Sequence, residues 1–584
     1  MVTNGKYILA NKGTSQWKIV IGKQASDSEV HAAHELQTFL KEISDADISI
    51  FDDTAEQTEY EILVGRSQRL DNLNVDVPWS NLGDEGFIIR TQDNKLIIAG
   101  GKLRGTLYGV YTFLEDYLGC RWFSSKVSHI PKREFIEIPC INYSKKPVLE
   151  YREPHYFDAF DGAWAVRNKA NGHFHRLEKK QGGKVEYSHF VHTFNTLFPI
   201  KEYFDTHPEY YSEVGGVRIS EKTQLCLTNP EVLRLTIEKV KNWCKEYPNA
   251  TIVSVSQNDC YNPCQCQNCK KVDEMEGSHS GTLIHFINKV AEAIEKEYPE
   301  KIIDTLAYAH TRQAPKYVKP RPNVVVRLCS IECCFSHPLE TCKEFNQDFI
   351  VKDGETFPND IRNWSKMCDR LYVWDYITNF AHYILPYPNF QVLQPNIQFM
   401  IRNNVKGIFE QGNYSEGGGG ELAELRAYVT AKLLWDPEYD VDLAINEFLS
   451  GYYGMAAAPI RDYMDMLRDK VLSENVHLNI YTPPSSPYLS EEIMMKAAEL
   501  FDRAESLADN DEVLERVKKA RLSIRYVQLS NMSKDCPERN QLIDQFFEDI
   551  SNAGITEVKE WTTLEKSKEV MKGISDATKH IIME

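Results

Sequence analysis

Four carboxylic acids stand at or just after short apolar runs, where acid–base chemistry could be built: Asp259, Glu332, Asp375 and Glu410. The clearest case lies in residues 251–271. There TIVSVS has the pattern of a buried strand, Gln-Asn-Asp follows it, and a Cys-rich loop leads to an amphipathic helix over 282–297. Strand, polar tip, loop and helix form one unit of an α/β barrel, whose active site lies at the C-terminal ends of the strands. Asp259 therefore stands where a catalytic carboxylate belongs, although Asn258 and Asp259 could equally cap the turn.

Other strand candidates recur at intervals that suit a barrel. The eight candidates cover residues 150–157, 185–192, 223–228, 251–256, 303–310, 324–331, 371–376 and 406–410. Each is followed by a loop or a plausible helix, as over 229–246. Eight β/α units in about 280 residues match the usual size of a (β/α)8 barrel. A doubly wound sheet is the alternative, but no Gly-rich phosphate-binding loop follows any candidate strand.

The pattern predicts an α/β protein of three domains. Residues 1–145 read as a small α/β accessory domain, with strands such as WKIVIG and YEILVGR and a helix over 28–44. Residues 146–420 form the predicted (β/α)8 TIM barrel. Residues 421–584 carry apolar residues at helical spacing and predict a C-terminal helical domain.

The side chains around the predicted barrel mouth suit glycoside hydrolysis. Two carboxyl groups flank the scissile bond, one protonating the leaving oxygen and the other attacking the anomeric carbon or activating water. Aromatic faces stack on sugar rings, and amides, imidazoles and phenols bind hydroxyls. The candidate catalytic residues are Glu332, Asp259 and Glu410. The candidate substrate-binding residues are Asn258, His189, His192, Tyr308, His310, Trp374, Asp375, Tyr376 and Asn413.

The loop after Asp259 contains Cys264, Cys266 and Cys269, with Cys260 just upstream. Four thiolates could hold a structural zinc ion, but the spacing is not that of the common zinc folds. The alternatives are one disulfide or free packed thiols, and the candidate site is expected to hold neither a metal nor a cofactor.

Composition excludes some classes of partner. The 584 residues carry a formal net charge of -18, which argues against nucleic acid and anionic membranes as main partners. No stretch approaches the ~20 apolar residues of a membrane span. The N-terminus lacks the pattern of a signal peptide, so we expect a cytoplasmic protein unless such a signal was removed.

Several sequence blocks carry a resemblance to a known family. HPEYYSEVGGVR, QLCLTNPEV, SQNDCYNPCQCQNC, CSIECCFSHPL and GIFEQGNY with ELAELRAYVTAKLLWDP resemble the domain-of-unknown-function family 4838, which includes glycoside hydrolase family 163. Residues 1 to about 140 resemble the N-terminal domain of α-glucuronidases. The resemblance covers roughly residues 10–450.

The resemblance implies a retaining, endo-acting β-N-acetylglucosaminidase that cleaves complex N-glycans, of the kind found in gut bacteria of the Bacteroides type. Such enzymes are exported, which would place the protein in the periplasm, at the cell surface or outside the cell. The acetamido group of such a substrate often serves as the nucleophile. Asn258 and Asp259 would then orient it, and Glu332, or alternatively Glu410, would be the general acid.

Two other functions stay open at this point. An α-glucuronidase-like hydrolase would need a cationic clamp for the uronate, for which Arg152, Arg167 and Arg312 are candidates. A non-catalytic glycan-binding protein would use the same aromatic side chains without a carboxyl pair. The oligomeric state is left open.

Overall fold

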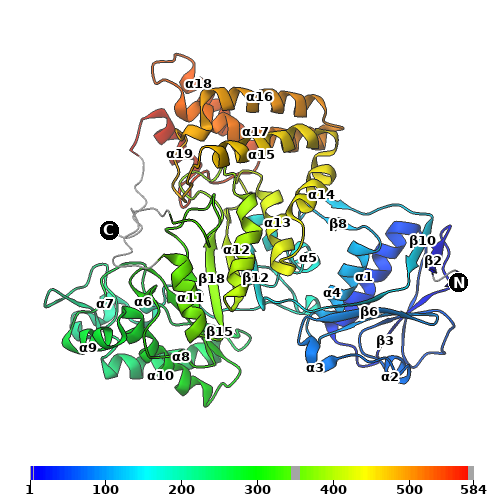
Figure 1. The fold of residues 1–584 in the computed structure, drawn as a ribbon, viewed down its shortest axis with the longest axis horizontal. Helices are drawn as coiled ribbons and strands as arrows, with labels where there is room; N and C mark the ends of the chain where they lie inside the picture. The colour runs from blue at the N-terminus through cyan, green and yellow to red at the C-terminus, as the bar shows by residue number, and fades with distance from the viewer. Residues whose placement is uncertain (1, 4–5, 344–355, 577–584) are drawn as a thin grey trace. The chain divides into compact units, whose positions relative to one another are not determined.

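The computed structural model describes residues 2–3, 6–343 and 356–576 (Figure 1). The chain divides into two compact units, Met1–Val148 with Asp158–Lys184, and Leu149–Phe157 with Val185–Glu584. The expected fold class is confirmed. An α/β sheet domain comes first, a parallel half-barrel sheet consistent with a (β/α)8 barrel follows, and helices complete the C-terminal part.

The first unit contains a six-stranded mixed sheet in the order β11-β6-β7-β5-β3-β4 and a three-stranded sheet in the order β1-β2-β10. A capping box between Ser26 and Glu29 starts helix α1 (Asp27–Ser44), whose apolar side is buried. The other strands and helices of this unit are β1 (Val2–Thr3), β2 (Lys6–Asn11), β3 (Lys18–Ile21), β4 (Ile50–Asp52), β5 (Glu61–Val64), α2 (Gln68–Asn72), α3 (Trp79–Leu82), β6 (Phe87–Gln92), β7 (Lys95–Gly100), α4 (Gly105–Asp116), β8 (Arg121–Trp122), β9 (Ser128–His129), β10 (Phe135–Pro139), β11 (Asn142–Lys145) and α5 (Gly162–Arg167).

The second unit is built on a parallel sheet of six strands in the order β12-β19-β18-β17-β16-β15. Their bounds are β12 (Tyr151–His155), β15 (Ile252–Ser254), β16 (Ile302–Ala307), β17 (Val324–Cys329), β18 (Leu371–Tyr376) and β19 (Val405–Gln411). The first strand pairs with the last, as in a barrel. Gly407 lies between Tyr151 and Tyr372, and any larger residue would place its Cβ within 2.8 Å of both. The missing side chain therefore lets the two tyrosine rings stack at 5.7 Å.

Two of the eight predicted strands do not form. Residues 185–192 add only one parallel bridge, between Tyr187 and Ile252, and His192 then turns the chain into the left-handed region at φ 53°. Residues 223–228 make a single antiparallel bridge through Leu225. Between residue 187 and β12 the circle of strands is closed by side chains: the aromatic rings of Tyr187 and Tyr151 are in edge-to-face contact, with centroids 5.9 Å apart. Side-chain packing thus replaces the missing backbone ladder.

A buried ion pair fills the interior of the barrel below the strand ends. Arg327 of β17 donates to Asp304 of β16 at 2.8 Å, and both are almost fully buried. The guanidinium lies over the rings of Phe190 and Trp374, at 4.3 and 5.2 Å from their centroids. Charge pairing and cation–π contact together compensate its desolvation. Around Arg327 the interior of the barrel is therefore a packed core.

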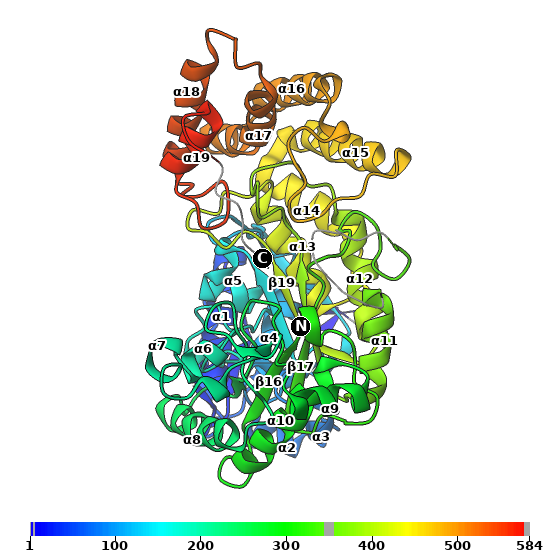
Figure 2. The ribbon, with the colours of Figure 1, turned by 90° about the vertical axis from the view of Figure 1, so that its left-hand side faces the viewer.

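Helices surround the sheet and continue into the C-terminal part, where α15–α18 gather at one end of this unit (Figure 2). The helix predicted over 229–246 is α8, and the one over 282–297 is α10. The helices are α6 (Phe194–Leu197), α7 (Ile200–Tyr203), α8 (Pro230–Glu246), α9 (Gln267–Glu276), α10 (His279–Glu295), α11 (Phe357–Met367), α12 (Phe390–Arg402), α13 (Ala423–Trp435), α14 (Val441–Tyr453), α15 (Ala457–Ser473), α16 (Glu491–Ser506), α17 (Asp511–Asn531), α18 (Arg539–Asn552) and α19 (Leu564–Lys572), and residues 213–214 and 217–218 form the short hairpin β13–β14. None of the helices in the described residues combines the length and apolar character that crossing a bilayer requires.

Candidate active site

The four carboxylates predicted at the strand ends do not all face the barrel mouth. Successive strand residues point to opposite faces of a sheet. Trp374 points inward, where its indole N–H donates to Gln411 Oε1 at 2.7 Å. Asp375, the next residue, therefore points to the outer face, and so does Glu410, which stands opposite it in the register of β18 and β19. Asp375 and Glu410 were expected to line the mouth. Because side chains alternate between the two faces of a strand, they point away from it instead.

Asp375 and Glu410 instead form a buried pair behind the sheet. They are 2% and 1% exposed, and Ser330 Oγ donates to Asp375 Oδ1 at 2.5 Å. Burial raises the pKa of Asp375 to about 6. Burial, and then the charge of Asp375, raise the pKa of Glu410 well above its ordinary value. Glu410 Oε2 has no hydrogen-bond partner within the described part of the chain. Burial and mutual repulsion thus both favour the protonated form of this pair.

Glu332 is held in a buried ion pair on the loop that follows β17. Arg312 contacts its carboxylate and also donates from Nε to Asp360 Oδ2 of α11 at 2.7 Å. All three residues are at most 3% exposed. A guanidinium in contact favours the ionised form of a carboxyl group. This environment disfavours Glu332 as a general acid, the role in which the sequence placed it first.

Asp259 is the predicted carboxylate that faces the barrel mouth. It is solvent-exposed, and Tyr308, at the end of β16, donates its phenolic proton to Asp259 Oδ1 at 3.0 Å. His192 lies beside them, with its ring 6.2 Å from that of Tyr308 and Nδ1 2.8 Å from the carbonyl of Gln257. Burial lowers the pKa of His192, against the opposing charge of Asp259. The imidazole is thus neutral at pH 7, with Nδ1 donating and Nε2 able to accept.

A second carboxylate reaches this mouth from the C-terminal part of the chain. Glu560 lies in the segment between α18 and α19, and its backbone N–H donates to the carbonyl of Phe380 at 3.0 Å. The N–H of Tyr383 donates to the carbonyl of Val558 at 2.9 Å. Tyr414, just beyond β19, donates its phenolic proton to Glu560 Oε1 at 3.0 Å. The loops after β18 and β19 therefore fix both the backbone and the side chain of this residue.

The glycine run at 417–420 permits this arrangement. Gly417 has φ 81°, and a Cβ there would lie 1.7 Å from the carbonyl oxygen of Gly554. Two side-chain bonds reinforce the contact, since Ser415 Oγ donates to Glu557 at 2.7 Å and Thr556 donates to the carbonyl of residue 416 at 2.7 Å. The C-terminal segment can lie flush on the β19 loop only because that loop lacks side chains there.

The electrostatics of Glu560 suit a general acid. The residue is 4% exposed, and burial raises its pKa to about 7, helped by the charges of Glu557 and Asp259 and opposed by the bond from Tyr414. Burial and the charges of Glu560 and Asp259 also raise the pKa of Tyr481. A buried, protonatable carboxyl within electrostatic reach of an exposed one is an arrangement by which two carboxyl groups take different roles.

Aromatic side chains form the floor of the mouth. Trp374 and Tyr376 are stacked with centroids 6.3 Å apart. The ring of His155, at the end of β12, lies 4.7 Å from Phe409 and 5.1 Å from Tyr414. Flat apolar faces bordered by polar edges suit the stacking of a sugar ring.

Two predicted binding amides hold the framework instead of facing the mouth. Asn258 donates to the carbonyl of Thr223 at 2.8 Å and to Asn195 Oδ1 at 3.0 Å, and it accepts from the backbone N–H of Asn195. Asn413 Oδ1 accepts from the N–H of Ser415 at 2.9 Å. Asn258 is therefore already engaged and is not available to orient a substrate, whereas Asn413 shapes the loop that leads to Tyr414.

The two remaining predicted histidines lie apart from the carboxylates. His189 stacks on Trp243 of α8 with ring centroids 3.8 Å apart. His310 lies between the rings of Tyr261 and His279, at 5.7 and 5.9 Å, on the side of the Cys-rich loop. Of the predicted set, the structure thus brings Asp259, His192, Tyr308, Trp374 and Tyr376 together.

The sequence reasoning missed Glu560, Tyr414, Tyr481, His155 and Gln411. His155 and Gln411 are the last residues of β12 and β19, so the strand-end rule itself could have found them. Tyr414 follows three residues later. Glu560 had no such signal, because it stands in a polar segment about 150 residues after the last strand, where a charge is normally solvated.

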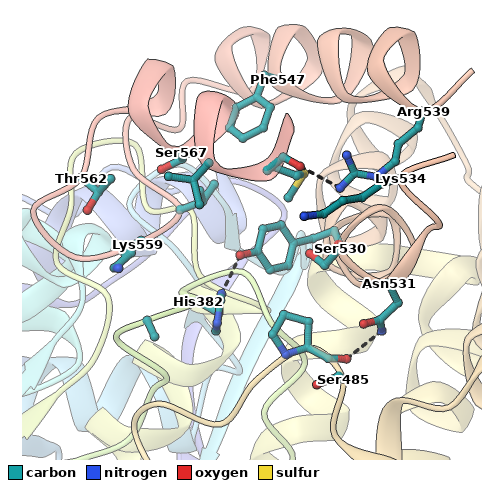
Figure 3. Close-up of a pocket in the computed structure, with 16 residues that line it drawn as sticks. His382, Ser485, Ser530, Asn531, Lys534, Arg539, Phe547, Lys559, Thr562 and Ser567 are labelled. Carbon is teal, nitrogen blue, oxygen red and sulfur yellow. Dashed lines mark hydrogen bonds between the residues drawn. The ribbon is translucent and has the colours of Figure 1, made fainter. Parts of the chain in front are cut away.

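A separate cavity of about 380 Å³ lies among the C-terminal helices (Figure 3). His382 Nδ1 is 2.6 Å from the phenolic oxygen of Tyr526 on its wall, and Lys534, Arg539 and Lys559 contribute cationic groups. Its described lining contains no carboxyl group. The cavity therefore has no acid for glycoside chemistry, and the barrel mouth is the stronger candidate.

Comparison with solved structures shows the same architecture in glycoside hydrolases. A family 115 4-O-methyl-α-glucuronidase with specificity for decorated arabinogalactans aligns with a TM-score of 0.58 at 12% identity, covering 94% of this chain and 77% of that one. A family 138 enzyme targeting pectin rhamnogalacturonan II aligns with a TM-score of 0.52 at 11% identity, covering 97% and 77%. At these identities the likeness concerns the fold alone.

Sequence comparison identifies the family. No curated protein matches the chain. Residues 10–113 match the N-terminus of glycosyl hydrolase family 67, which agrees with the resemblance of this region to α-glucuronidases. Residues 122–465, more than half of the chain, match the domain of unknown function DUF4838 and include Asp259 and the whole parallel sheet. The chain therefore belongs to the DUF4838 family and has a glycoside-hydrolase-like fold.

Proposed function

We propose that the protein hydrolyses glycosidic bonds, with Glu560 as the general acid and Asp259 as its carboxylate partner. The observation that carries the proposal is the pairing of a buried carboxyl whose pKa is about 7 with an exposed carboxylate whose charge helps to raise it. Glycoside hydrolysis needs these two states at one bond. The shared fold supports the same reaction class.

We propose a β-N-acetylglucosaminide as the substrate, cleaved with retention and with the help of its own acetamido group. Glu560 would protonate the departing oxygen while the acetamido oxygen attacks the anomeric carbon. Asp259 would accept the acetamido N–H, held in place by the phenol of Tyr308. The ionised Glu560 would then take a proton from the water that opens the cyclic intermediate, which restores the acid. Both protonation states of Glu560 are accessible near pH 7.

Complex N-glycans, cleaved internally, are the proposed natural substrate, and the sequence blocks that resemble family 163 support this. The alternative, an α-glucuronidase-like hydrolase, would need a free arginine to bind the uronate, and the three candidate arginines are already engaged. Arg152 lies over Trp435, 5.4 Å from its ring centroid, Arg312 binds Glu332, and Arg167 binds Glu35. Each of the three is thus already engaged by a partner within its own compact unit.

The test is product analysis with purified protein. A complex N-glycoprotein, an aryl β-N-acetylglucosaminide and an aryl α-glucuronide are incubated separately, and the products are identified by mass spectrometry. We expect a released glycan that leaves one N-acetylglucosamine on the protein, and no cleavage of the glucuronide. Cleavage of the glucuronide alone would replace the substrate proposal.

A glycan-binding protein without catalysis remains the alternative from another class. Calorimetric binding of the N-glycan with no product after prolonged incubation would favour it and reject hydrolysis. Asp259→Asn and Glu560→Gln serve as the matched inactive controls for any observed turnover.

A further inference from the structure

Four buried cysteines converge beside the candidate active site. Cys226 precedes α8, whereas Cys264, Cys266 and Cys269 lie at the start of α9, and all four sulfur atoms lie within 4.8 Å of one another. Their exposed fractions are between 2% and 8%. From the sequence, Cys260 was expected to be the fourth member of this group. In the structure the fourth member is Cys226, which stands 38 positions before Cys264.

The spacing of the sulfur atoms fits a metal and not a disulfide. Cys226 Sγ is 3.7 Å from Cys266 Sγ and 3.9 Å from Cys269 Sγ. Tetrahedral zinc with Zn–S bonds of about 2.3 Å requires sulfur atoms about 3.8 Å apart. A disulfide would need about 2.05 Å. All four thiols are free.

The surroundings supply donors aimed at the sulfur atoms. The backbone N–H of Glu213 donates to Cys264 Sγ at 3.4 Å, and Arg218 approaches the same atom at 3.5 Å. Thr228 Oγ1 is 3.1 Å from Cys269 Sγ. Such groups offset the negative charge of metal-bound thiolates and orient them. Four soft ligands with no open position are typical of a structural zinc site.

We propose that Cys226, Cys264, Cys266 and Cys269 bind one structural zinc ion, which positions the loop that carries Asp259. The link is Gln224, two residues before Cys226. Its Nε2 donates to the carbonyls of Asn258 and Cys260, at 2.9 and 2.7 Å, and its Oε1 accepts from the N–H of Asn258 at 2.9 Å. Gln224 thus holds both neighbours of Asp259. The metal site itself is independent of the proposed activity, because it rests on the sulfur geometry.

Metal content measured by inductively coupled plasma mass spectrometry tests the site without an activity assay. We expect Cys226→Ser and Cys269→Ser each to lose one equivalent of zinc relative to the wild-type protein. The matched control is Cys260→Ser, because Cys260 lies in the same loop but its thiol contacts Gln224 and Thr223 and stands outside the four-cysteine cluster of the described residues. It should keep the wild-type zinc content. Loss of zinc from the control, with retention in Cys226→Ser, would overturn the ligand set.

The wild-type protein gives a second measurement if a variant does not fold. Cobalt substitution should produce the visible absorption and sulfur-to-metal charge transfer of a tetrahedral thiolate centre. Non-reducing peptide mass spectrometry should find the four thiols unlinked. A disulfide among them, or the absence of zinc and of a thiolate–cobalt spectrum, would reject the proposal.

A second cluster of possible metal ligands consists of two cysteines and two histidines: Cys334, Cys342, His337 and His477. Cys334 Sγ is 3.3 Å from His477 Nδ1 and 3.4 Å from His337 Nδ1, and Cys342 Sγ is 3.7 Å from His477 Nδ1. Tetrahedral zinc with Zn–N of about 2.0–2.1 Å and Zn–S of about 2.3 Å places sulfur about 3.5 Å from nitrogen. The four ligand atoms lie within 4.8 Å of one another. We infer a second zinc site that ties the loop after β17 to the segment after α15.

The number of zinc ions per protein distinguishes the two proposed sites. His477→Ala should remove one equivalent of zinc and leave the thiolate–cobalt spectrum of the four-cysteine site intact. The matched control is His382→Ala, because this histidine contacts Tyr526 and lines the cavity of Figure 3, and it is not among the four clustered ligands. An unchanged zinc content in folded His477→Ala would reject the second site and leave the first untouched.

Discussion

Two pairs of acidic residues lie at the C-terminal ends of the same sheet, and their environments differ. Asp375 and Glu410 face each other behind the sheet with Ser330 as a hydrogen-bond donor. Asp259 and Glu560 lie in front of it, the first exposed and the second buried. Only the front pair combines solvent access with a raised pKa. A raised pKa alone therefore does not identify a catalytic acid. The side of the sheet to which the carboxyl group points determines whether it can reach a substrate.

The largest expected effect is on turnover of natural glycans. Glu560→Gln should lower kcat by about 10²- to 10⁴-fold, the range of general acid catalysis, whereas Glu410→Gln should stay near the wild-type value. An activated aryl substrate needs less protonation, so it should suffer less in Glu560→Gln. Steady-state kinetics on both substrates measure this. If Glu410→Gln showed the dependence on the leaving group instead, the roles of the two pairs would be exchanged.

The pH profile of kcat should show the ionisation of Glu560. The general acid must carry its proton, and its pKa is about 7. We expect kcat to fall about tenfold per pH unit well above that value. The alkaline limb should disappear in Glu560→Gln and persist in Asp375→Asn. An unchanged limb in Glu560→Gln would assign the acid to another group.

Asp375 and Glu410, the pair behind the sheet, should affect the stability of the protein and not its catalytic rate. The pKa of Asp375 rises from 3.8 unfolded to about 6 folded, so the folded state binds the proton more tightly. Its contribution is favourable below about pH 4 and is lost as the pH rises through about 6, at a cost of about 1–3 kcal/mol. Asp375→Asn should therefore gain in Tm relative to the wild type as the pH rises from 4 to 7. A pH-independent difference would contradict the raised pKa.

The smallest effect on kcat is expected from Glu332→Gln. The amide can still accept a bond from Arg312, and the carboxylate that it replaces is already engaged in a buried ion pair. We expect kcat near the wild-type value and a lower Tm, because the buried Arg312 guanidinium loses the charge of Glu332. A large loss of kcat in a variant with wild-type circular dichroism would restore Glu332 as a catalytic candidate.

Much of the fold could be predicted from local patterns. Apolar runs ending in polar tips located six strands of the barrel, and helical periodicity located α8 and α10 to within a few residues. Residues 223–228 resembled a strand but bind through side chains such as Gln224 to the Cys-rich loop. Strand propensity does not tell whether a neighbour will supply backbone partners.

The site was predictable only where sequence position determines it. Tyr308 directly follows β16, and Asp259 lies five residues beyond the end of β15, so the strand-end rule located both. The choice between the faces at Asp375 and Glu410 needed the register, because a shift by one residue reverses the direction of every side chain. Glu560 and Cys226 reach their partners through long-range packing, which no local pattern encodes.

The flush contact between Gly417 and Gly554 also orders events in time. Asp259 leaves the ribosome first, and Glu560 follows about 300 residues later, which at about 5–20 residues per second is on the order of 15–60 s. During that interval the sheet can form with the four clustered cysteines and Asp259 in place, but without Glu560. On the proposed mechanism, a nascent chain would stay inactive until its C-terminal segment docks on the glycine loop.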